Sequence, residues 1–258
     1  MAHGRHFLFF EGEMITDIIK YLMNYKFMKT LGILGGVGPE TTARVYLSVI
    51  DLVRKNKSEK YPPIVVYNLP FPFVIENEAI VQGKNSEKMI PYLIEGAKIL
   101  EKAGASFGIL PCNTLHKHIN EIRASVKIPF LSILEETFLS LQSLKVKTVG
   151  VLATQTTVDS KIYSGVLQKK TINILYPTKT EQDEINKIII QLLNGGKNNL
   201  QDRKIETICL SLQTRGAEAI LLACTDLQLA TIKISDLVKI IDTTEILIKA
   251  SVRELART

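Results

Sequence analysis

Four sequence blocks occur twice in this chain in the same order, and this repetition constrains the fold more than any other feature. "KTLGILGG" (29–36) matches "KTVGVLAT" (147–154), and "GASFGILPCNT" (104–114) aligns with "GAEAILLACTD" (216–226). Two threonines followed by a tyrosine come after the first block in each half, and "IPFLSILEE" roughly matches "VKIIDTTEI". One such match would be generic strand–helix similarity, but the shared order predicts two similar lobes.

Each half alternates short apolar runs with segments of helical apolar spacing. The runs that predict strands are 30–36, 63–69, 107–111, 127–133, 147–153, 172–177, 217–223 and 237–242. Strands separated by helices are typical of βαβ units and parallel sheets. We therefore expect an α/β fold with two pseudo-symmetric lobes, each a mainly parallel sheet flanked by helices, and an active site in the cleft between them. The expected first lobe is 28–125 with 237–258, and the second is 126–236.

Residues 1–27 are distinct from the rest and form an expected N-terminal extension. Acidic residues follow the apolar "HFLFF" at once, which is a poor secretory signal, and 14–23 has helical apolar spacing. Two interpretations stay open. The segment is either an amphipathic extension that packs on the body or on a partner, or the product of a start codon placed too far upstream of Met28.

Composition excludes several classes of function. No apolar run approaches the ~18 residues that span a bilayer, so we expect no membrane partner. The net charge is +6, but Lys and Arg are spread along the chain, so we expect no nucleic-acid partner. Three cysteines are an odd number without metal-site spacing, which favours a reducing, cytoplasmic location and no metal.

Cys112 and Cys224 occupy equivalent positions in the two halves. Each follows an apolar run that predicts a buried strand, and small polar residues suited to a helix start come next. A helix N-terminus is expected to lower the pKa of a thiol. Two thiols facing one cleft would suit a two-base proton transfer. The alternative for any one cysteine is a small buried hydrophobe, and this suits Cys209 in its helical stretch.

The combination of "GILGGVGPETT", "PCNTLH" and "ACTDL" resembles the aspartate/glutamate racemase superfamily, and within it the aspartate racemases, over about residues 28–255. The resemblance implies two similar α/β lobes, no pyridoxal phosphate, no metal or other cofactor, and a homodimer. It assigns the acid and base roles to Cys112 and Cys224. It implies a small-molecule amino-acid substrate, with aspartate as the expected one.

The resemblance also implies the residues that line the substrate pocket. These are the turn of Gly36, Val37 and Gly38, and the residues Asn113, Thr114 and Thr225. Further candidates for substrate binding are Asn68, Thr154, Thr157 and Lys197. The turn at 36–38 could hold a carboxylate with its backbone N–H groups. Thr154 and Thr157 either bond the substrate carboxylate or cap a helix. His116 either tunes the thiolate or contacts the substrate, or it is a surface or supporting residue. His118 is expected to face solvent.

One departure from the resemblance concerns the substrate side chain. Aspartate-specific relatives tend to have an arginine after the second strand and a lysine before the small-residue turn near 195. Here "FPFVIENEA" contains no basic residue, and Asn194 stands at the second place with Lys197 beyond it. Either Lys197 substitutes, or the pocket takes a larger or less charged side chain beside Phe71, Phe73 and Ile75.

Three functions therefore stay open. The first is a cofactor-independent amino-acid racemase with two thiols. The second is a hydrolase, isomerase or decarboxylase that uses a single cysteine. The third is a non-catalytic small-molecule binding protein on the same scaffold. Two cysteines in matching contexts favour the first.

Overall fold

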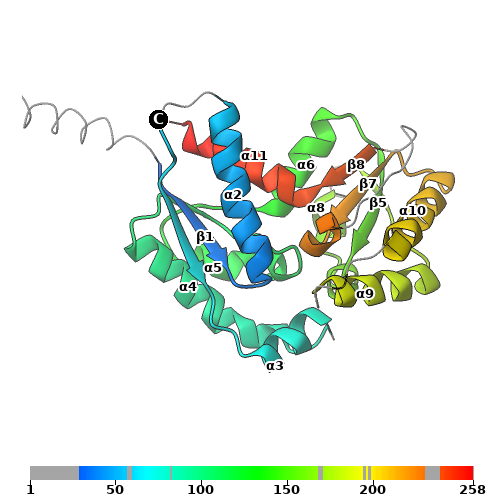
Figure 1. The fold of residues 1–258 in the computed structure, drawn as a ribbon, viewed down its shortest axis with the longest axis horizontal. Helices are drawn as coiled ribbons and strands as arrows, with labels where there is room; N and C mark the ends of the chain where they lie inside the picture. Colours follow the sequence, from blue (N-terminus) through cyan, green and yellow to red (C-terminus); the bar gives the residue numbers. More distant parts are fainter. Residues whose placement is uncertain are drawn as a thin grey trace, which may run out of the picture.

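The computed structural model describes residues 29–56, 60–81, 83–167, 171–193, 196, 199–229 and 239–257. The expected N-terminal extension and Lys197 lie outside these residues. The described residues form two lobes, each built on a four-stranded parallel sheet with helices packed against it (Figure 1).

Both sheets have the same strand order, β2-β1-β3-β4 in the first lobe and β6-β5-β7-β8 in the second. The first contains β1 (Leu31–Gly35), β2 (Ile64–Asn68), β3 (Phe107–Ile109) and β4 (Phe130–Leu131). The second contains β5 (Thr148–Ala153), β6 (Asn173–Leu175), β7 (Ala219–Ala223) and β8 (Lys239–Asp242). The matching order confirms the two pseudo-symmetric α/β lobes that the repeated blocks predict.

Helices and tight helical turns connect the strands. Up to β4 they are α2 (Pro39–Lys55), α3 (Phe73–Glu76), the π-helical turn η1 (Asn77–Val81), the 3₁₀ turn η2 (Ser86–Met89), α4 (Ile90–Lys102), the 3₁₀ turn η3 (Thr114–His118) and α5 (Ile119–Ser125). After β4 they are α6 (Ile133–Ser143), α7 (Gln155–Asp159), α8 (Ile162–Leu167), α9 (Lys179–Leu193), α10 (Asn199–Thr214), the 3₁₀ turn η5 (Thr225–Leu229) and α11 (Thr243–Leu255).

Sheet membership differs from the expected lobe boundaries at two strands. β4 pairs with β3 in the first sheet, with Phe130 opposite Gly108, although the expected second lobe began at residue 126. β8 pairs with β7 in the second sheet, with Ile240 opposite Ile220, although 237–258 was expected in the first lobe. A parallel strand usually pairs beside the strand that precedes it in the chain, so β4 stays with the sheet of β3 and β8 with the sheet of β7. The division of the remaining residues between the lobes stays a prediction.

The strands are apolar because both faces of each sheet are covered. Along β1, Leu31 and Ile33 join a core cluster on one face, and Leu34 joins another cluster on the side of α4. All five residues of β1 and of β7 are buried. Continuous burial of this kind is typical of parallel sheets between helical layers.

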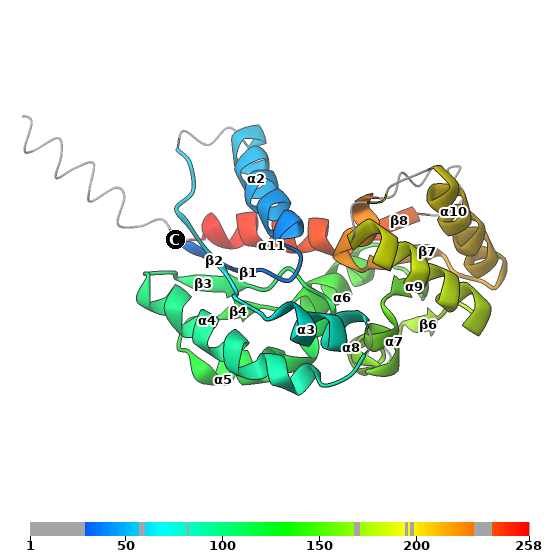
Figure 2. The ribbon, with the colours of Figure 1, turned by 60° about the horizontal axis from the view of Figure 1, so that its bottom comes forward.

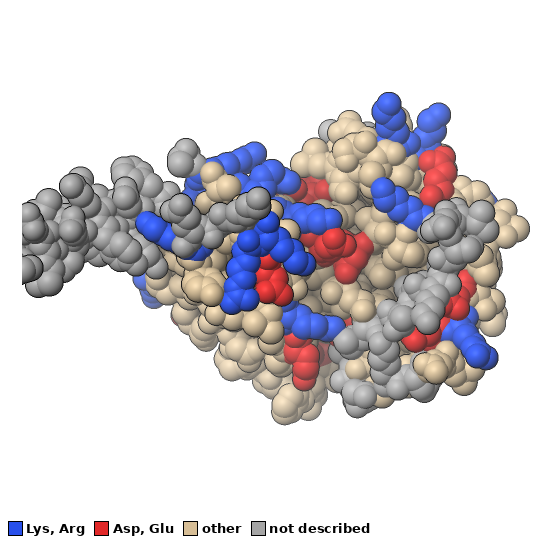
Figure 3. All heavy atoms as spheres, turned by 45° about the horizontal axis from the view of Figure 1, so that its top comes forward, with Lys and Arg blue, Asp and Glu red and all other residues tan. Residues whose placement is uncertain are grey.

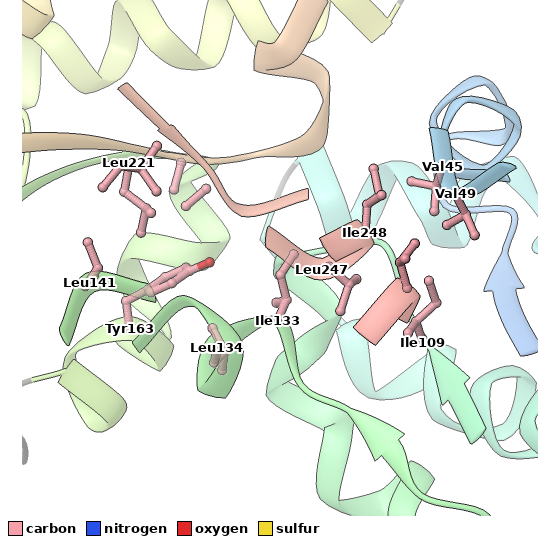
Figure 4. Close-up of a cluster of buried hydrophobic side chains, with 14 of the residues drawn as sticks. Val45, Val49, Ile109, Ile133, Leu134, Leu141, Tyr163, Leu221, Leu247 and Ile248 are labelled. Atoms are coloured by element: carbon pink, nitrogen blue, oxygen red, sulfur yellow. The ribbon is translucent and has the colours of Figure 1, made fainter. Parts of the chain in front are cut away.

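One hydrophobic core runs through both lobes. In Figure 4, Leu247 and Ile248 of α11 lie between Val45 and Val49 of α2 on one side and Ile133 of α6 on the other. α11 packs against both α2 and α6. The C-terminal helix therefore joins the lobes by apolar packing.

Charged side chains are distributed over both lobes. On the face in Figure 3, Asp and Glu side chains lie among the Lys and Arg side chains of each lobe. Within the part of the chain that the structure describes, no helix is both long and apolar enough to cross a membrane.

We expect Gly108→Ala to destabilise the first sheet. A Cβ atom at Gly108 would lie 2.4 Å from Cζ of Phe130, a ring that is 2% exposed and has little room to move. Overpacking of this kind typically costs about 1–3 kcal/mol, which urea unfolding followed by circular dichroism would measure. The matched control is Gly165→Ala at an exposed position of α8, where a Cβ meets nothing within 4 Å and helix propensity should add up to ~1 kcal/mol. Equal unfolding midpoints for the two variants would contradict the packing argument.

Candidate active site

A cavity of about 380 Å³ opens between the two lobes. Residues from both lobes line it: Val37, Gly38, Pro39, Glu40, Phe73, Glu76, Asn77, Ile80, Cys112, Asn113, Thr114, Thr154, Cys224, Thr225 and Asp226. The loops after β1, β3, β5 and β7 all contribute, so the carboxyl ends of the central strands of both sheets point toward it. Open parallel sheets place ligand sites at this edge.

Cys112 and Cys224 come to this cavity from equivalent places. Cys112 lies after β3 and just before η3, and Cys224 lies after β7 and just before η5. Both side chains line the cavity and each residue is 6% exposed. They are close enough that the charge of one thiolate raises the pKa of the other thiol. By contrast Cys209, on α10, is fully buried in the apolar core of the second lobe and does not line the cavity.

The prediction that a helix N-terminus lowers the pKa of the cavity thiols is wrong for this structure. Burial raises the pKa of Cys112 to about 12, and the N–H groups of Leu115 and Thr114 oppose the shift only in part. Burial also raises the pKa of Cys224 well above its ordinary value, and the nearby Asp226 carboxylate adds to the rise. Asp226 Oδ2 lies 3.7 Å from Cys224 Sγ. Desolvation of the thiolate outweighs the few N–H donors because η3 and η5 are short turns rather than long helices.

Three buried threonine hydroxyls form a triangle across the lobe boundary. Thr114 Oγ1 lies 3.1 Å from Oγ1 of both Thr154 and Thr157, and these two are 3.0 Å apart. Thr154 also caps α7 by accepting the N–H of Thr157 at 3.2 Å, so the capping interpretation holds for it. Thr114 and Thr154 line the cavity, while Thr157 lies outside its lining. Their hydroxyl protons can turn from each other toward an anion in the cavity.

The side chain of Asn113 is held on both sides by the second lobe and α11. Its Nδ2 donates to Thr243 Oγ1 at 3.0 Å, and its Oδ1 accepts from the buried Tyr163 hydroxyl. Thr243 in turn donates to the carbonyl of Leu222 on β7 at 2.9 Å. Asn113 lines the cavity, but its amide is committed to this network, which fixes the loop that carries Cys112 against the second lobe.

The glycine turn after β1 uses its donors within the protein. Gly36 has a φ of 98° and its N–H donates to Thr42 Oγ1 at 3.1 Å, and a Cβ there would lie 2.5 Å from the Leu69 nitrogen. The N–H of Gly38 donates to the carboxylate of Glu76. Both glycine N–H groups therefore already have acceptors within the protein. Neither can bind a substrate carboxylate, as the sequence predicted, unless its present hydrogen bond breaks.

His116 supports the Cys112 loop from behind. Its Nδ1 is 2.7 Å from the Cys112 carbonyl, and its Nε2 accepts the N–H of Ile133 at 3.0 Å. The second bond requires Nε2 to be unprotonated, so Nδ1 is the donor. Burial lowers the pKa of His116 to about 4, which keeps the ring neutral. His118 was expected in solvent, but it is 6% exposed and bonds Ser86 Oγ at 3.2 Å, because η3 turns it toward η2.

Sequence reasoning missed three carboxylates of the cavity wall: Glu40, Glu76 and Asp226. Two of them lie inside the quoted motifs "GPETT" and "ACTDL", so their position was a usable signal. Glu76 lies on α3, beside α7 of the other lobe in Figure 2, and only the folded chain brings it there. Among the described residues, no group of three or more His, Cys, Asp or Glu is arranged to hold a metal ion.

Some of the expected pocket residues line the cavity and others do not. Val37, Gly38, Asn113, Thr114, Thr154 and Thr225 line the cavity with the two thiols. Gly36, Asn68 and Thr157 are absent from its lining, and Asn68 is exposed at the end of β2. Lys197 lies outside the described residues.

Comparison with known proteins identifies the family of this two-lobed fold. The family model described as Asp/Glu/hydantoin racemase matches residues 34–251. The chain belongs to the Asp/Glu/hydantoin racemase family. It is thus an enzyme of the isomerase class that acts on a small amino-acid substrate.

Relatives of known name cover most of the chain. The broad-specificity amino-acid racemase RacX of Bacillus subtilis is 31% identical over 226 residues, which are 86% of this chain and 96% of the relative. A solved aspartate racemase homologue from Pyrococcus horikoshii is 28% identical, with a TM-score of 0.74 over 89% of this chain and 100% of the other. The aspartate racemase of Picrophilus torridus is 26% identical, with a TM-score of 0.72 over 89% and 95%.

We expect the cavity thiols to react slowly with iodoacetamide at pH 7 in the folded protein. Because burial raises the pKa of Cys112 to about 12, its alkylation should be at least ~100-fold slower than in the urea-unfolded chain and should rise with pH above 9. Peptide mass mapping after timed labelling measures each thiol. Cys209 is the control, since it is fully buried, does not line the cavity and should label more slowly still. Alkylation of Cys112 at a constant rate from pH 6 to 9 would contradict the raised pKa.

The ring of His116 should stay neutral, with its proton on Nδ1, down to about pH 4. Long-range ¹H–¹⁵N NMR of the imidazole reports both the charge and the tautomer. As the pH falls from about 6.5 toward about 4, the unfolded chain binds a proton here that the folded chain does not. The folded state therefore loses stability as pH falls, by on the order of 3 kcal/mol from this group. An imidazolium signal for His116 at pH 6 would refute this assignment.

Proposed function

We propose that this protein is a cofactor-independent amino-acid racemase that moves a proton at Cα between two thiols, Cys112 and Cys224. The observation that supports it best is the meeting of two cysteines, from equivalent strand ends of two similar lobes, at one cavity. A cavity between pseudo-symmetric lobes presents one group to each face of a bound carbon. Inversion at a carbon requires this arrangement of an acid and a base.

The proposed reaction is a pair of proton transfers. One cysteine as thiolate removes the α-proton and becomes a thiol, and the other gives its proton to the opposite face and becomes a thiolate. The electrostatic coupling of the two sulfurs favours this pairing, since ionisation of Cys112 raises the pKa of Cys224. Their burial also makes the one thiolate a stronger base than an exposed thiolate.

We assign the α-carboxylate of the substrate to the hydroxyl side of the cavity. Thr114 and Thr154 line this side, and Thr225 begins η5 directly after Cys224. Their hydroxyls are donors in a buried site, where hydrogen bonds to a charged group contribute about 1.5–3 kcal/mol. Asn113 has a positioning role in this proposal, because its amide bonds Tyr163 and Thr243.

Aspartate is the substrate that the sequence resemblance implies, and it is part of the proposal only as a member of a wider class. Glu40, Glu76 and Asp226 line the cavity, and no Lys, Arg or His does so among the described residues. A second carboxylate on the substrate would meet these charges without an opposing cation. We therefore propose a broad range of amino acids and include aspartate in the test.

The location and assembly of the protein are also proposals. The mechanism needs both sulfurs reduced, and all three cysteines are free, which favours the cytoplasm. We keep the homodimer as a prediction that sedimentation equilibrium would test.

Replacing either cavity cysteine by serine should reduce racemisation by orders of magnitude, because the hydroxyl is too weak an acid to carry the proton. The sharper measurement uses a β-chloro amino acid, from which removal of the α-proton leads directly to loss of chloride. Each single variant should eliminate from one enantiomer only, and the two variants should have opposite preferences. We expect Cys224 to act on the L form and Cys112 on the D form.

The matched control is Cys209→Ser, which replaces a cysteine outside the cavity and should keep racemisation near that of the wild type. A variant at Cys112 or Cys224 that kept full racemase activity would exclude the two-thiol mechanism. Loss of elimination from both enantiomers in both variants would instead favour a reaction with a single nucleophilic cysteine.

A further inference from the structure

One wall of the cavity is acidic. Glu40 lies in the first turn of α2, Glu76 lies at the end of α3, and Asp226 lies in η5. All three line the cavity that holds the two thiols. Burial raises the pKa of Glu76, and the carboxylates of Asp226 and Glu40 add to the rise, so the three groups lie close enough to act on one another. Carboxylates placed together repel one another when charged, and a positively charged ligand would relieve this repulsion.

The protein supplies little compensation of its own. Glu76 accepts one hydrogen bond from the N–H of Gly38, and a Cβ at Gly38 would lie 3.9 Å from Asp226 Oδ1, so both carboxylates lie close to this turn. Burial raises the pKa of Asp226, and the charge of Arg44 opposes this rise only in part. The Arg44 guanidinium bonds Thr41 Oγ1 and does not line the cavity. Among the described residues, the cavity is therefore lined by three acidic side chains and by no basic one.

Apolar surface surrounds the carboxylates. Val37, Pro39, Phe73 and Ile80 line the same cavity, and Phe73 is 86% exposed. An aliphatic chain can lie along such a surface while its charged end reaches a carboxylate, as lysine stems do in proteins. The lining thus matches a ligand with a methylene stem and a cationic end.

Such a ligand would have two cationic groups, the α-ammonium and the end of the side chain, and a different carboxylate would face each. Asp226 lies 3.7 Å from Cys224 Sγ and hence beside the reacting carbon, where the α-ammonium of any amino acid would lie. Glu76 comes from α3 and is fixed by the Gly38 N–H, so it remains for the side chain. We infer that Glu76 is a specificity-determining residue and that the enzyme acts on amino acids with a cationic, aliphatic side chain, such as lysine and ornithine. This inference rests on the proposed function.

The test compares L-lysine with L-norleucine, which has the same four-carbon length of side chain without the ammonium, and with L-aspartate. Exchange of the α-proton in D₂O, followed by ¹H NMR, measures the same step for all three. Wild-type kcat/KM should be at least ~10-fold higher for lysine than for norleucine, a difference of about 1.4 kcal/mol, and aspartate should be slowest. Glu76→Gln should lower the lysine-to-norleucine ratio ~10-fold. Glu95→Gln, at an exposed position of α4, should keep the wild-type ratio.

A binding measurement accompanies the kinetics. Lysine should protect the cavity thiols from alkylation at lower concentration than norleucine in the wild type, and Glu76→Gln should remove this difference. The inference is overturned if aspartate or norleucine exchanges as fast as lysine, or if Glu76→Gln leaves the ratio unchanged. Exchange of neutral or acidic amino acids without lysine would overturn the inference alone and leave the two-thiol function. Exchange of no amino acid would overturn both.

Discussion

The packing of α11 between the two lobes is the interaction on which the rest of the structure depends. Leu247 and Ile248 fill the space between α2 and α6, and they join the apolar faces of both sheets into one core. At the start of the same helix, Thr243 bonds both Asn113 and the Leu222 carbonyl. Apolar packing holds the lobes together. These buried hydrogen bonds fix the orientation of one lobe relative to the other, because a different orientation would leave buried polar groups unpaired and would lower stability.

The fixed orientation of the two lobes brings two equivalent loops to one cavity. Each loop ends a buried strand with a cysteine and continues as a 3₁₀ turn, so the sulfurs come from related positions of two sheets. Burial is the dominant influence on both thiols, and it raises their pKa more than the nearby N–H donors lower it. His116 then holds the Cys112 loop by two bonds that require a neutral ring, and burial keeps it neutral.

The chemistry of the cavity combines a hydroxyl side with an acidic side. Thr114 and Thr154 present donors, while Glu76 and Asp226 present acceptors. This polarity suits an amino acid, whose α-carboxylate and α-ammonium carry opposite charges on one carbon. In our proposal a dicarboxylate fits this cavity less well than a cationic amino acid, because carboxylates and no cationic side chains line it among the described residues.

The α/β class, the eight strands, the two similar lobes and the two cavity cysteines could all be predicted from the amino-acid sequence. These features depend on local apolar patterns and on short motifs, which can be recognised in the sequence without the tertiary structure. The tertiary structure alone decided the strand partners of β4 and β8, because pairing depends on where a crossover returns the chain. It also placed Asn68 outside the cavity and Glu76 within it. The side chain of Glu76 meets residues of distant segments only after the lobes pack, and the high thiol pKa likewise comes from burial that no local pattern reports.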